Sequence, residues 1–418
     1  MAEQTQIFSG IEGKLQACIH CGLCLEFCPT YLETHEEMSS PRGRIHLMKA
    51  VDEGTLAISD PLLREHEFSC LVCRSCETAC PSGVEFSVLM EHTRDAIVKN
   101  APNNFFRRFI YTKLLGSKQL TNVLQFFLAV AAKTRIISLL GKTFSRSRGI
   151  LSSVRLLPEN IPFPHARAQM YPAIGKKIGT VGLLIGCIGD VFTKEVNNAT
   201  IKVLTRLGYD VHTLPEIGCC GALAAHAGYL DRSKALAREV LSAIEHSEIS
   251  YFISNIAGCG AMMKDYANIL GSSEISNVMK IKDISEFLFE HHYDDLKAFG
   301  LRFEEPTRIP YHAPCHLYHG QKIIDTPARL LSLIENATVT LLEENDICCG
   351  SAGTYNVERP EMAESLLERK LNIIGKNGSE IVATANAGCL MQLRSGLLTH
   401  RNHTQASHFI EVMASLMP

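Results

Sequence analysis

The second half of the chain alternates short apolar runs with amphipathic segments. Apolar runs at residues 177–186, 211–214 and 251–254 have the composition of buried strands. Apolar positions at helical spacing follow the first two runs, at about 196–207 and 233–244. Strands that alternate with helices predict a parallel sheet with helices on its faces.

This strand–helix pattern occurs twice. Further strands are expected at 309–314, 339–342 and 381–384. In both halves, cysteines follow the predicted strands, at the edge where parallel sheets place their sites. They are Cys187, Cys219, Cys220 and Cys259 in the first half and Cys315, Cys348, Cys349 and Cys389 in the second. Equivalent cysteines lie 128 to 130 residues apart, which predicts a duplication into two α/β lobes.

The first hundred residues have helical rather than strand periodicity. Residues 41–51 predict a helix with Ile45, Met48 and Val51 on one face, and residues 81–99 predict another. The residues expected on the inward face of that second helix are Val88, Leu89, His92 and Ala96. The predicted fold class is therefore α and α/β multidomain, with an all-helical N-terminal domain followed by the two lobes.

Between these regions lies a stretch without acidic residues. Residues 96–158 hold no Asp or Glu and eleven Lys or Arg, among apolar residues at helical spacing. A basic amphipathic helix is typical of contact with a membrane surface or an acidic partner, and the alternative is a linker that packs on its own domains. No motif for nucleic-acid recognition accompanies the charge. We predict domains at 1–100, 101–171, 172–300 and 301–418, the second being this basic linker.

Composition indicates the compartment. The chain has 418 residues, 46% of them hydrophobic and 20% charged, which is typical of a globular protein. Residues 1–14 lack the basic and apolar regions of a signal peptide, and there is no run of 18 uncharged apolar residues. A cytoplasmic location is therefore expected. In that reducing compartment, sixteen cysteines indicate metal or redox chemistry rather than disulfides.

Half of the cysteines form two copies of one motif. The pattern C-x2-C-x2-C-x3-C-P occurs at residues 18–29 and again at 70–81. This is the spacing of bacterial ferredoxins with two [4Fe–4S] clusters, in which the fourth cysteine of each motif binds the other cluster. The first predicted ligand set is Cys18, Cys21, Cys24 and Cys80, and the second set is Cys28, Cys70, Cys73 and Cys76. Zinc would leave the third cysteine and the proline of each motif without a role.

Three arginines near these motifs have two interpretations. Arg42, Arg44 and Arg74 are candidates for docking the acidic face of a partner. The alternative is that they are ordinary solvated side chains, since single surface charges contribute little.

Each predicted lobe presents four thiols. Four thiolates suit an iron–sulfur group or zinc, and the alternative is a reduced thiol cluster that serves as scaffold. Gly221 and Gly350, directly after the paired cysteines, allow a sharp turn and the close approach of a cluster. His316, beside Cys315, is a candidate extra ligand, although a structural histidine is the more common role.

No motif for hydride or phosphate chemistry is present. The sequence has no G-x-G-x-x-G after a strand, and Gly-Lys-Thr at 141–143 lacks the glycine that a phosphate loop needs at position 136. No catalytic residue is therefore expected on this chain. The sequence predicts an electron conduit whose flavin lies on another subunit.

Over nearly its full length the chain resembles the iron–sulfur subunits of bacterial glycolate oxidase, a glycolate dehydrogenase. The resemblance is carried by both ferredoxin motifs and by residues 40–45, 218–221, 258–261, 348–355 and 384–389. It implies partner subunits that carry FAD and oxidise glycolate to glyoxylate. It also implies that electrons pass singly through two [4Fe–4S] clusters to a membrane quinone, with the complex held peripherally on the cytoplasmic face of the inner membrane.

The lobes are similar to the wider cysteine-rich CCG group, which includes heterodisulfide reductase subunits and a subunit of anaerobic glycerol-3-phosphate dehydrogenase. In heterodisulfide reductases the last motif is C-x-x-C, whereas Ile256 and Asn386 stand here in place of its first cysteine. Four thiolates favour an ordinary cubane or zinc over the five-thiolate cluster of that group. The alternatives are a subunit of a D-lactate or glycerol-3-phosphate dehydrogenase, a thiol/disulfide enzyme, and a non-catalytic scaffold.

Overall fold

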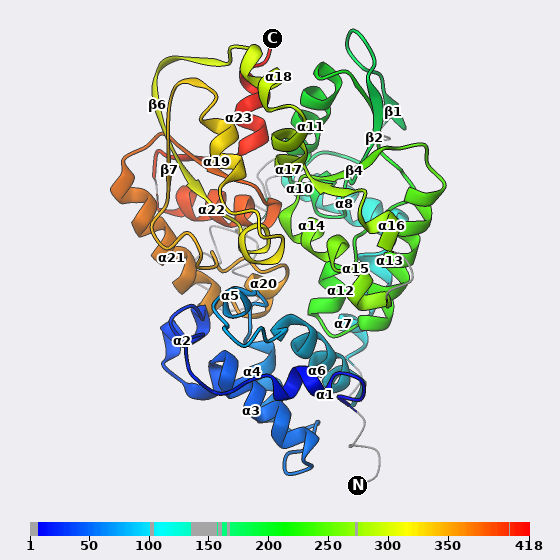
Figure 1. Cartoon of the computed structure of the whole chain (residues 1–418), viewed down its shortest axis with the longest axis vertical. Helices are drawn as coiled ribbons and strands as arrows, with labels where there is room; N and C mark the ends of the chain where they lie inside the picture. Colours follow the sequence, from blue (N-terminus) through cyan, green and yellow to red (C-terminus); the bar gives the residue numbers. More distant parts are fainter. Residues whose placement is uncertain are drawn as a thin grey trace.

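The structure has a helical N-terminal region and two α/β lobes. This computed structural model describes residues 7–100, 104–134, 157, 161–164, 168–271, 275–400 and 402–418. Figure 1 shows the helical region at one end of the molecule and the two lobes side by side beyond it. The predicted α and α/β multidomain architecture is confirmed.

The N-terminal region, residues 7–100, contains helices and loops and no strand. Its helices are α1 (Glu12–Gln16), α2 (Pro29–Thr34), the 3-10 helix η2 (Glu37–Ser39), α3 (Pro41–Asp52), α4 (Pro61–Phe68), α5 (Ser75–Thr78) and α6 (Phe86–Asn100). α3 matches the helix predicted at 41–51, and Ile45, Met48 and Val51 are buried on it as expected. Helices α2, α3 and α4 each begin with a proline, whose fixed φ suits the first helical turn.

The helix predicted at 81–99 begins later than expected and turns a different face inward. α6 starts at Phe86, because the preceding residues continue the cysteine loop. Its buried apolar residues include Phe86, Leu89, Met90 and Ile97. Of the four residues predicted to face inward, Leu89 is buried, whereas Val88, His92 and Ala96 are half-buried. The face is rotated because Arg94 points inward, where its guanidinium donates to the backbone carbonyls of Glu67, Cys70 and His226.

Each lobe is built on a sheet with the same strand order. The first sheet runs β1-β3-β2-β4-β5, with β1 (Met170–Tyr171), β2 (Gly179–Leu183), β3 (Tyr209–His212), β4 (Tyr251–Ser254) and β5 (Ile281–Asp283). The second runs β7-β6-β8-β9, with β6 (Arg302–His312), β7 (Glu335–Leu341), β8 (Ile381–Thr384) and β9 (Gln405–His408). All pairings are parallel except that of β1 with β3. Without β1 the two orders are equivalent, which confirms the duplication.

Helices cover both sheets. The first lobe has α10 (Gly189–Phe192), α11 (Lys194–Arg206), α12 (Ala222–His226), α13 (Leu230–Glu245), α14 (Ala257–Lys264), α15 (Tyr266–Leu270), α16 (Ile275–Val278), α17 (Ile284–His291) and α18 (Tyr293–Ala298). The second has the π-helix η6 (His316–Gly320), α19 (Thr326–Leu331), α20 (Tyr355–Glu358), α21 (Pro360–Asn377), α22 (Ala387–Thr399) and α23 (Phe409–Leu416). α11 and α13 correspond to the helices predicted at 196–207 and 233–244.

The two lobes share one apolar core. Buried residues of both sheets, such as Val181 of β2 and Ile309 of β6, belong to a single cluster. α23, the last helix of the chain, packs against α11 of the first lobe. Lys202 of α11 donates to the backbone carbonyls of Ala414 and Met417. The lobes therefore form one folded unit.

Three helices connect the N-terminal region to the first lobe. They are α7 (Phe105–Phe109), the π-helix η3 (Ile110–Leu114) and α8 (Lys118–Lys133). Arg107 is held by the chain itself, since it pairs with Glu358 at 3.3 Å and stacks on the Phe68 ring. Arg135, Lys142, Arg146, Arg148 and Arg155 of the acid-free stretch, and the Gly-Lys-Thr at 141–143, lie outside the described residues.

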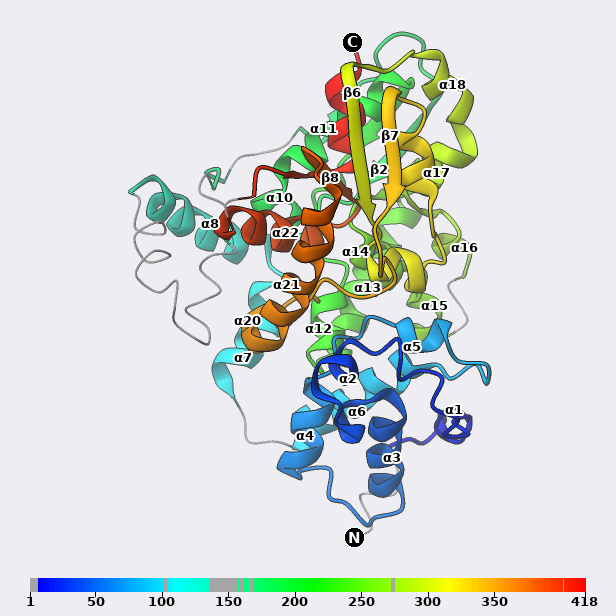
Figure 2. The ribbon, with the colours of Figure 1, turned by 90° about the vertical axis from the view of Figure 1, so that its left-hand side faces the viewer.

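Helices α7 and α8 turn their apolar side outward, and Figure 2 shows α8 at the edge of the molecule. The exposed large apolar residues of these helices are Phe105, Phe106, Phe109, Leu120, Val123, Leu124, Phe126, Phe127 and Val130. On the opposite side, Ala129 packs near Val191 and Gln125 donates to the carbonyl of Pro162. The described part of the chain therefore leaves most of this apolar surface uncovered. Within the described residues, no helix is long and apolar enough to cross a bilayer.

Gly43 lies where α3 meets η2, and no larger residue fits there. A Cβ on Gly43 would lie 1.9 Å from the carbonyl oxygen of Glu37. The backbone NH of Gly43 also donates to the Ser40 hydroxyl, which caps α3. The first ferredoxin motif and α3 therefore depend on one close backbone contact.

Replacing Gly43 by alanine is expected to destabilise the N-terminal region by about 1–3 kcal/mol, because the backbone must move apart. Gly13→Ala is the matched control, since Gly13 lies in α1 and an added Cβ there meets nothing within 4 Å. Alanine also favours the helix at that position. Thermal unfolding of the two purified variants measures the difference, and equal losses of stability would contradict this interpretation.

Candidate metal centres

The four cysteines of the second predicted set surround one hollow. Cys28, Cys70, Cys73 and Cys76 line one small hollow, together with Arg44, Arg74 and mostly apolar residues. Cys28 directly precedes α2, Cys70 and Cys73 lie on the loop between α4 and α5, and Cys76 lies in α5. All four are buried, and no disulfide joins any of the sixteen cysteines. Four buried thiols around a hollow are the donor set that a [4Fe–4S] cluster needs.

The backbone of the two cysteine loops has the same unusual shape. Val72 and Arg74 have positive φ angles of 52° and 65°, and the equivalent His20 and Gly22 have 58° and 87°. A positive φ is rare for a β-branched residue and persists where the surroundings impose it. In the second loop it lets the NH of Val72 donate to the thiol of Cys70 at 3.3 Å.

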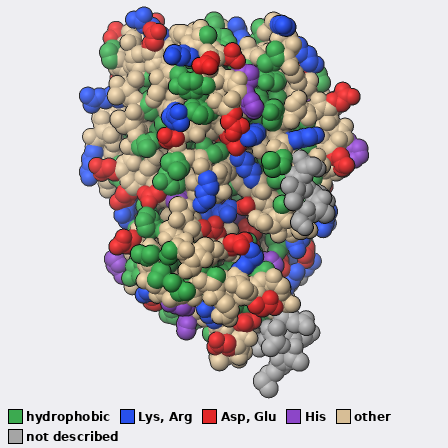
Figure 3. Space-filling model, in the orientation of Figure 1, with side chains coloured by type: hydrophobic (Ala, Val, Ile, Leu, Met, Phe, Trp, Pro, Cys, Tyr) green, Lys and Arg blue, Asp and Glu red, His purple; other side chains and the backbone are tan. Residues whose placement is uncertain are grey.

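The first predicted set lies at the surface. Cys21 is exposed, and Cys18, Cys24 and Cys80 are half-buried. Burial, reinforced by the nearby thiols of Cys28 and Cys18, raises the pKa of Cys24 to about 11. The neighbouring Ile19 and Leu23 are 68% and 57% exposed. Figure 3 shows hydrophobic side chains gathered over the N-terminal region on the face drawn there. The two sets therefore differ: one faces solvent and the other faces the interior.

Two buried arginines surround the second set. Arg44 is fully buried, and its guanidinium lies 3.9 Å from the Cys28 thiol and donates to the carbonyl of His66 at 2.8 Å. Arg94 donates to the carbonyl of Cys70 at 2.6 Å. Burial raises the pKa of the Glu67 carboxyl to about 8, against the lowering effect of the two arginines. The guanidinium groups of Arg44 and Arg94 therefore place positive charge around the second set.

The docking hypothesis for three arginines is wrong for two of them. Arg44 is buried, and Arg74 pairs with Glu77 at 2.8 Å and with Asp265 of the first lobe. The third, Arg42, lies at the surface and pairs with Glu37. These side chains bind the chain's own carboxylates and backbone, so they hold the N-terminal region together and against the lobes.

The first lobe gathers its four cysteines at the carboxyl edge of its sheet. Cys187 follows β2, Cys219 and Cys220 follow β3, and Cys259 lies on α14 after β4. The Cys187 and Cys219 sulfurs are 3.6 Å apart. Hydrogen bonding with Cys187 lowers the pKa of Cys219 well below its ordinary value. Gly221, with φ of 88°, passes close to Ser233 as a sharp turn requires.

The second lobe gathers its quartet in the same way. Cys315 and Cys348 have sulfurs 3.9 Å apart, and hydrogen bonding with Cys348 lowers the pKa of Cys349 well below its ordinary value. Asn386, which stands where the C-x-x-C motif has a cysteine, donates to the Cys389 thiol at 3.5 Å. All four thiols are buried. In each quartet, hydrogen bonding between neighbouring thiols therefore favours the thiolate of one cysteine, the form that binds metals.

A histidine that we did not predict joins the second quartet. His312, at the end of β6, is 1% exposed. One of its ring nitrogens, the Cys349 sulfur and the Cys389 sulfur all lie within 4.8 Å of one another. Comparison of the two repeats could have found it. The first repeat has Leu184 at the equivalent position, 128 residues earlier, so a polar residue replaces an apolar one in the second repeat.

The second set and the second lobe are in contact. Leu71 and Cys73 of the N-terminal region share one apolar cluster with Cys315 and Cys348. The Tyr355 hydroxyl donates to the Ser69 carbonyl across the same boundary. This meeting of two cysteine groups, distant in sequence, has no signal in local sequence patterns.

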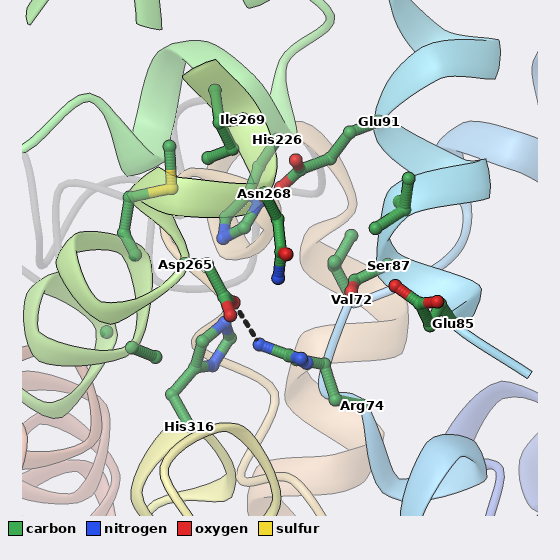
Figure 4. A pocket seen from close by; sticks show the side chains of 14 residues that line it. Val72, Arg74, Glu85, Ser87, Glu91, His226, Asp265, Asn268, Ile269 and His316 are labelled. Carbon is green, nitrogen blue, oxygen red and sulfur yellow. Dashed lines mark hydrogen bonds and ion pairs between the residues drawn. The ribbon is translucent and has the colours of Figure 1, made fainter. Parts of the chain in front are cut away.

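The ring of His316 faces a pocket outside the second cysteine quartet. Its Nδ1 lies 3.5 Å from the Cys315 thiol, and its ring lines a pocket between the N-terminal region and both lobes. Figure 4 shows it beside the Arg74–Asp265 ion pair, with His226 and Glu91 further along the pocket. His316 therefore contacts one thiol of the quartet, and its role as an extra ligand stays a prediction.

Family models match three segments of the chain. Residues 14–84 match a 4Fe-4S dicluster domain, and residues 181–264 and 309–394 each match a cysteine-rich domain. The chain is 34% identical to the probable glycolate oxidase iron-sulfur subunit of Bacillus subtilis (strain 168), over 92% of this chain and 90% of that protein. It is 30% identical to the glycolate oxidase iron-sulfur subunit of Escherichia coli (strain K12), over 96% and 93%.

The chain belongs to the family of glycolate oxidase iron–sulfur subunits. A more distant relative is lactate utilization protein A of Exiguobacterium sp. (strain ATCC BAA-1283 / AT1b), at 26% identity over 56% of this chain and 96% of that protein. The predicted family membership is confirmed. This family member is therefore an iron–sulfur, electron-transferring component of an oxidoreductase.

Replacing Arg44 by glutamine is expected to lower the midpoint potential of a cluster at the second set by on the order of 50–100 mV. A buried positive charge beside a cluster favours its more negative, reduced form. Arg44→Lys keeps the charge and is the matched control, expected to retain most of the potential. Potentiometric EPR titration measures both. An unchanged potential in Arg44→Gln, with the cluster retained, would contradict the electrostatic role.

Proposed function

We propose that this chain is the electron-transfer subunit of a flavin-dependent glycolate dehydrogenase complex. Partner subunits that carry FAD oxidise glycolate to glyoxylate, and this chain passes the electrons singly to a membrane quinone. The observation that carries the proposal is the contrast between the two cysteine sets. One set reaches the surface at Cys21, and the other is buried among Leu71, Cys73 and Cys315. Such a pair of sites suits a protein in which electrons enter at the surface set and leave from the buried set.

The residues of the chain supply the ligands and the surroundings. Cys18, Cys21, Cys24 and Cys80 bind one [4Fe–4S] cluster, and Cys28, Cys70, Cys73 and Cys76 bind the second. When bound, such clusters exchange one electron at a time, which divides the two-electron reaction of a flavin. Arg44 and Arg94 stabilise added negative charge at the second cluster, so electrons favour moving inward. The lobe quartets bind further iron–sulfur or zinc groups.

The exposed side of the first set suits contact with the flavin subunit. Ile19 and Leu23 flank Cys21 and are largely exposed. Apolar residues around an exposed ligand exclude water when a partner binds, and they shorten the path for an electron. This surface is therefore the expected entry point.

Helices α7 and α8 suit the surface of an anionic membrane. Their exposed phenylalanines and leucines form an apolar face, and the exposed Arg108 and Lys113 lie beside it. Apolar side chains that enter the interface, together with cations that attract anionic lipid, are the features of peripheral membrane helices. The absence of acidic residues from 96–158 favours a lipid surface. This contact holds the complex at the cytoplasmic face, close to its quinone.

Lactate is the second candidate substrate, because the chain also matches proteins named lactate utilization protein A. The choice of 2-hydroxy acid belongs to the flavin subunits, which hold the substrate. A heterodisulfide-type reaction is disfavoured, since Ile256 and Asn386 replace a cysteine of each C-x-x-C motif.

The function is tested on the complex purified with its co-expressed flavin subunits. Glycolate is expected to reduce the clusters of this chain, seen by EPR, and to drive reduction of a soluble quinone analogue. A complex that oxidises D-lactate but not glycolate would overturn the substrate. A complex whose clusters stay oxidised while glycolate is consumed would overturn the electron-transfer role.

The membrane contact is tested by sedimentation with vesicles of phosphatidylethanolamine and phosphatidylglycerol. Phe106→Ser with Phe127→Ser should weaken binding at all salt concentrations, because apolar area is lost. Arg108→Gln with Lys113→Gln should weaken it mainly at low salt, where charge attraction acts. Leu398→Ser is the control, since Leu398 is equally exposed but lies on the second lobe. Unchanged sedimentation of both double variants would overturn the membrane proposal and leave a subunit as the occupant.

A further inference from the structure

His312 is a buried histidine whose ring lies against a thiol. Its side chain is 1% exposed, and the hydrogen-bonding partner of its ring within the described part of the chain is the Cys349 thiol, with no oxygen or nitrogen partner at either ring nitrogen. Buried polar groups are nearly always satisfied, so an imidazole partnered by a thiol alone needs an explanation. The nearest donors and acceptors of the right chemistry are the sulfurs of Cys349 and Cys389, within 4.8 Å.

The second quartet and His312 together offer five donors. His312, Cys349 and Cys389 form one mutually close group. Cys348 is hydrogen-bonded to both Cys315 and Cys349, so the other two thiols adjoin that group. Cys315 and Cys348 also share an apolar cluster with Cys73. A tetrahedral ion takes four ligands, so five adjoining donors suit a group with several metal ions.

The first lobe lacks this histidine. Leu184 occupies the equivalent position and is buried in the apolar cluster of its own lobe. The lobes share strand order and cysteine spacing, so the imidazole marks a chemical difference between them. The lobe that has it is also the lobe whose cysteines contact Cys73 of the N-terminal region.

We propose that His312 is a ligand of an iron–sulfur group in the second lobe, bound together with Cys315, Cys348, Cys349 and Cys389. The group receives one electron from the cluster at Cys73, which is oxidised as the lobe group is reduced, and no atom moves. A neutral imidazole makes the group less negative than thiolates alone, which raises its potential and favours acceptance. This inference rests on the electron-transfer function proposed above and names the next acceptor in the chain.

Two other histidines of this lobe have different surroundings. His319 is 1% exposed, but its two nitrogens are paired with the Thr78 hydroxyl and the Asp346 carbonyl. His316 is half-buried and lies beside the Cys315 thiol. His319 is therefore the matched control: a buried histidine of the same lobe whose hydrogen bonds are satisfied.

The test uses the full chain, purified without oxygen with its native metals. Pulsed EPR of the reduced protein is expected to show a strong nitrogen hyperfine coupling, which changes when histidine is labelled with ¹⁵N. His312→Gln should abolish this coupling and lower the iron content, while His319→Gln should retain both. His312→Cys should keep the iron but lower the midpoint potential, because a thiolate replaces the neutral ligand.

Two results would overturn the inference in distinguishable ways. If the protein holds iron beyond the about eight atoms of two [4Fe–4S] clusters and no histidine coupling is seen, His312 is not a ligand, and the electron-transfer function stands. If the second lobe holds zinc, with iron limited to the N-terminal clusters, this lobe is not an electron acceptor. Failure of the proposed function itself has another signature, namely N-terminal clusters that glycolate and the flavin subunits cannot reduce.

Discussion

Four thiols from two separate segments meet around one hollow, and the rest of the structure is arranged about that meeting. Cys28 precedes α2, whereas Cys70, Cys73 and Cys76 lie beyond α3 and α4. Bringing them together requires α3 and α4 to pack on each other and on η2, with Gly43 at the tightest contact. Metal binding to such a set contributes free energy to folding, because the unfolded chain has no such site. Buried Arg44 and Arg94 bind the backbone around it.

The cysteine groups follow one another from the surface of the molecule to its interior. The first cysteine set faces solvent through Cys21, and the second faces Cys315 and Cys348 of the second lobe. The first lobe contributes support, since its Asp265 holds Arg74 of the second cysteine loop. Both lobes therefore hold the N-terminal region, the second also through Tyr355, but among the described residues the cysteines of the second lobe are the ones that share an apolar cluster with Cys73. The two lobes also differ in chemistry, because the second has His312 at the position where the first has Leu184.

Local patterns predicted the architecture, because strand periodicity and cysteine spacing depend on near neighbours. β4 and β8 begin and end where the apolar runs do, and the equivalent sheets follow from the regular cysteine offset. The failures all concern distant partners. The inward turn of α6 depends on Arg94 reaching carbonyls of another helix, and the burial of Arg44 depends on Cys28 and His66. Neither Val72 with its positive φ nor the contact of Cys73 with Cys315 has a local signal.

The most direct measurement compares EPR spectra of three reduced full-length variants, Cys28→Ser, Cys73→Ser and Cys18→Ser. Cys28 lies with Cys73 around one hollow, although Cys28 belongs to the same motif as Cys18. Cys28→Ser and Cys73→Ser are therefore expected to alter the same signal and to leave intact the one that Cys18→Ser alters. If Cys28→Ser instead alters the signal that Cys18→Ser alters and leaves the Cys73 signal intact, the arrangement described here is wrong.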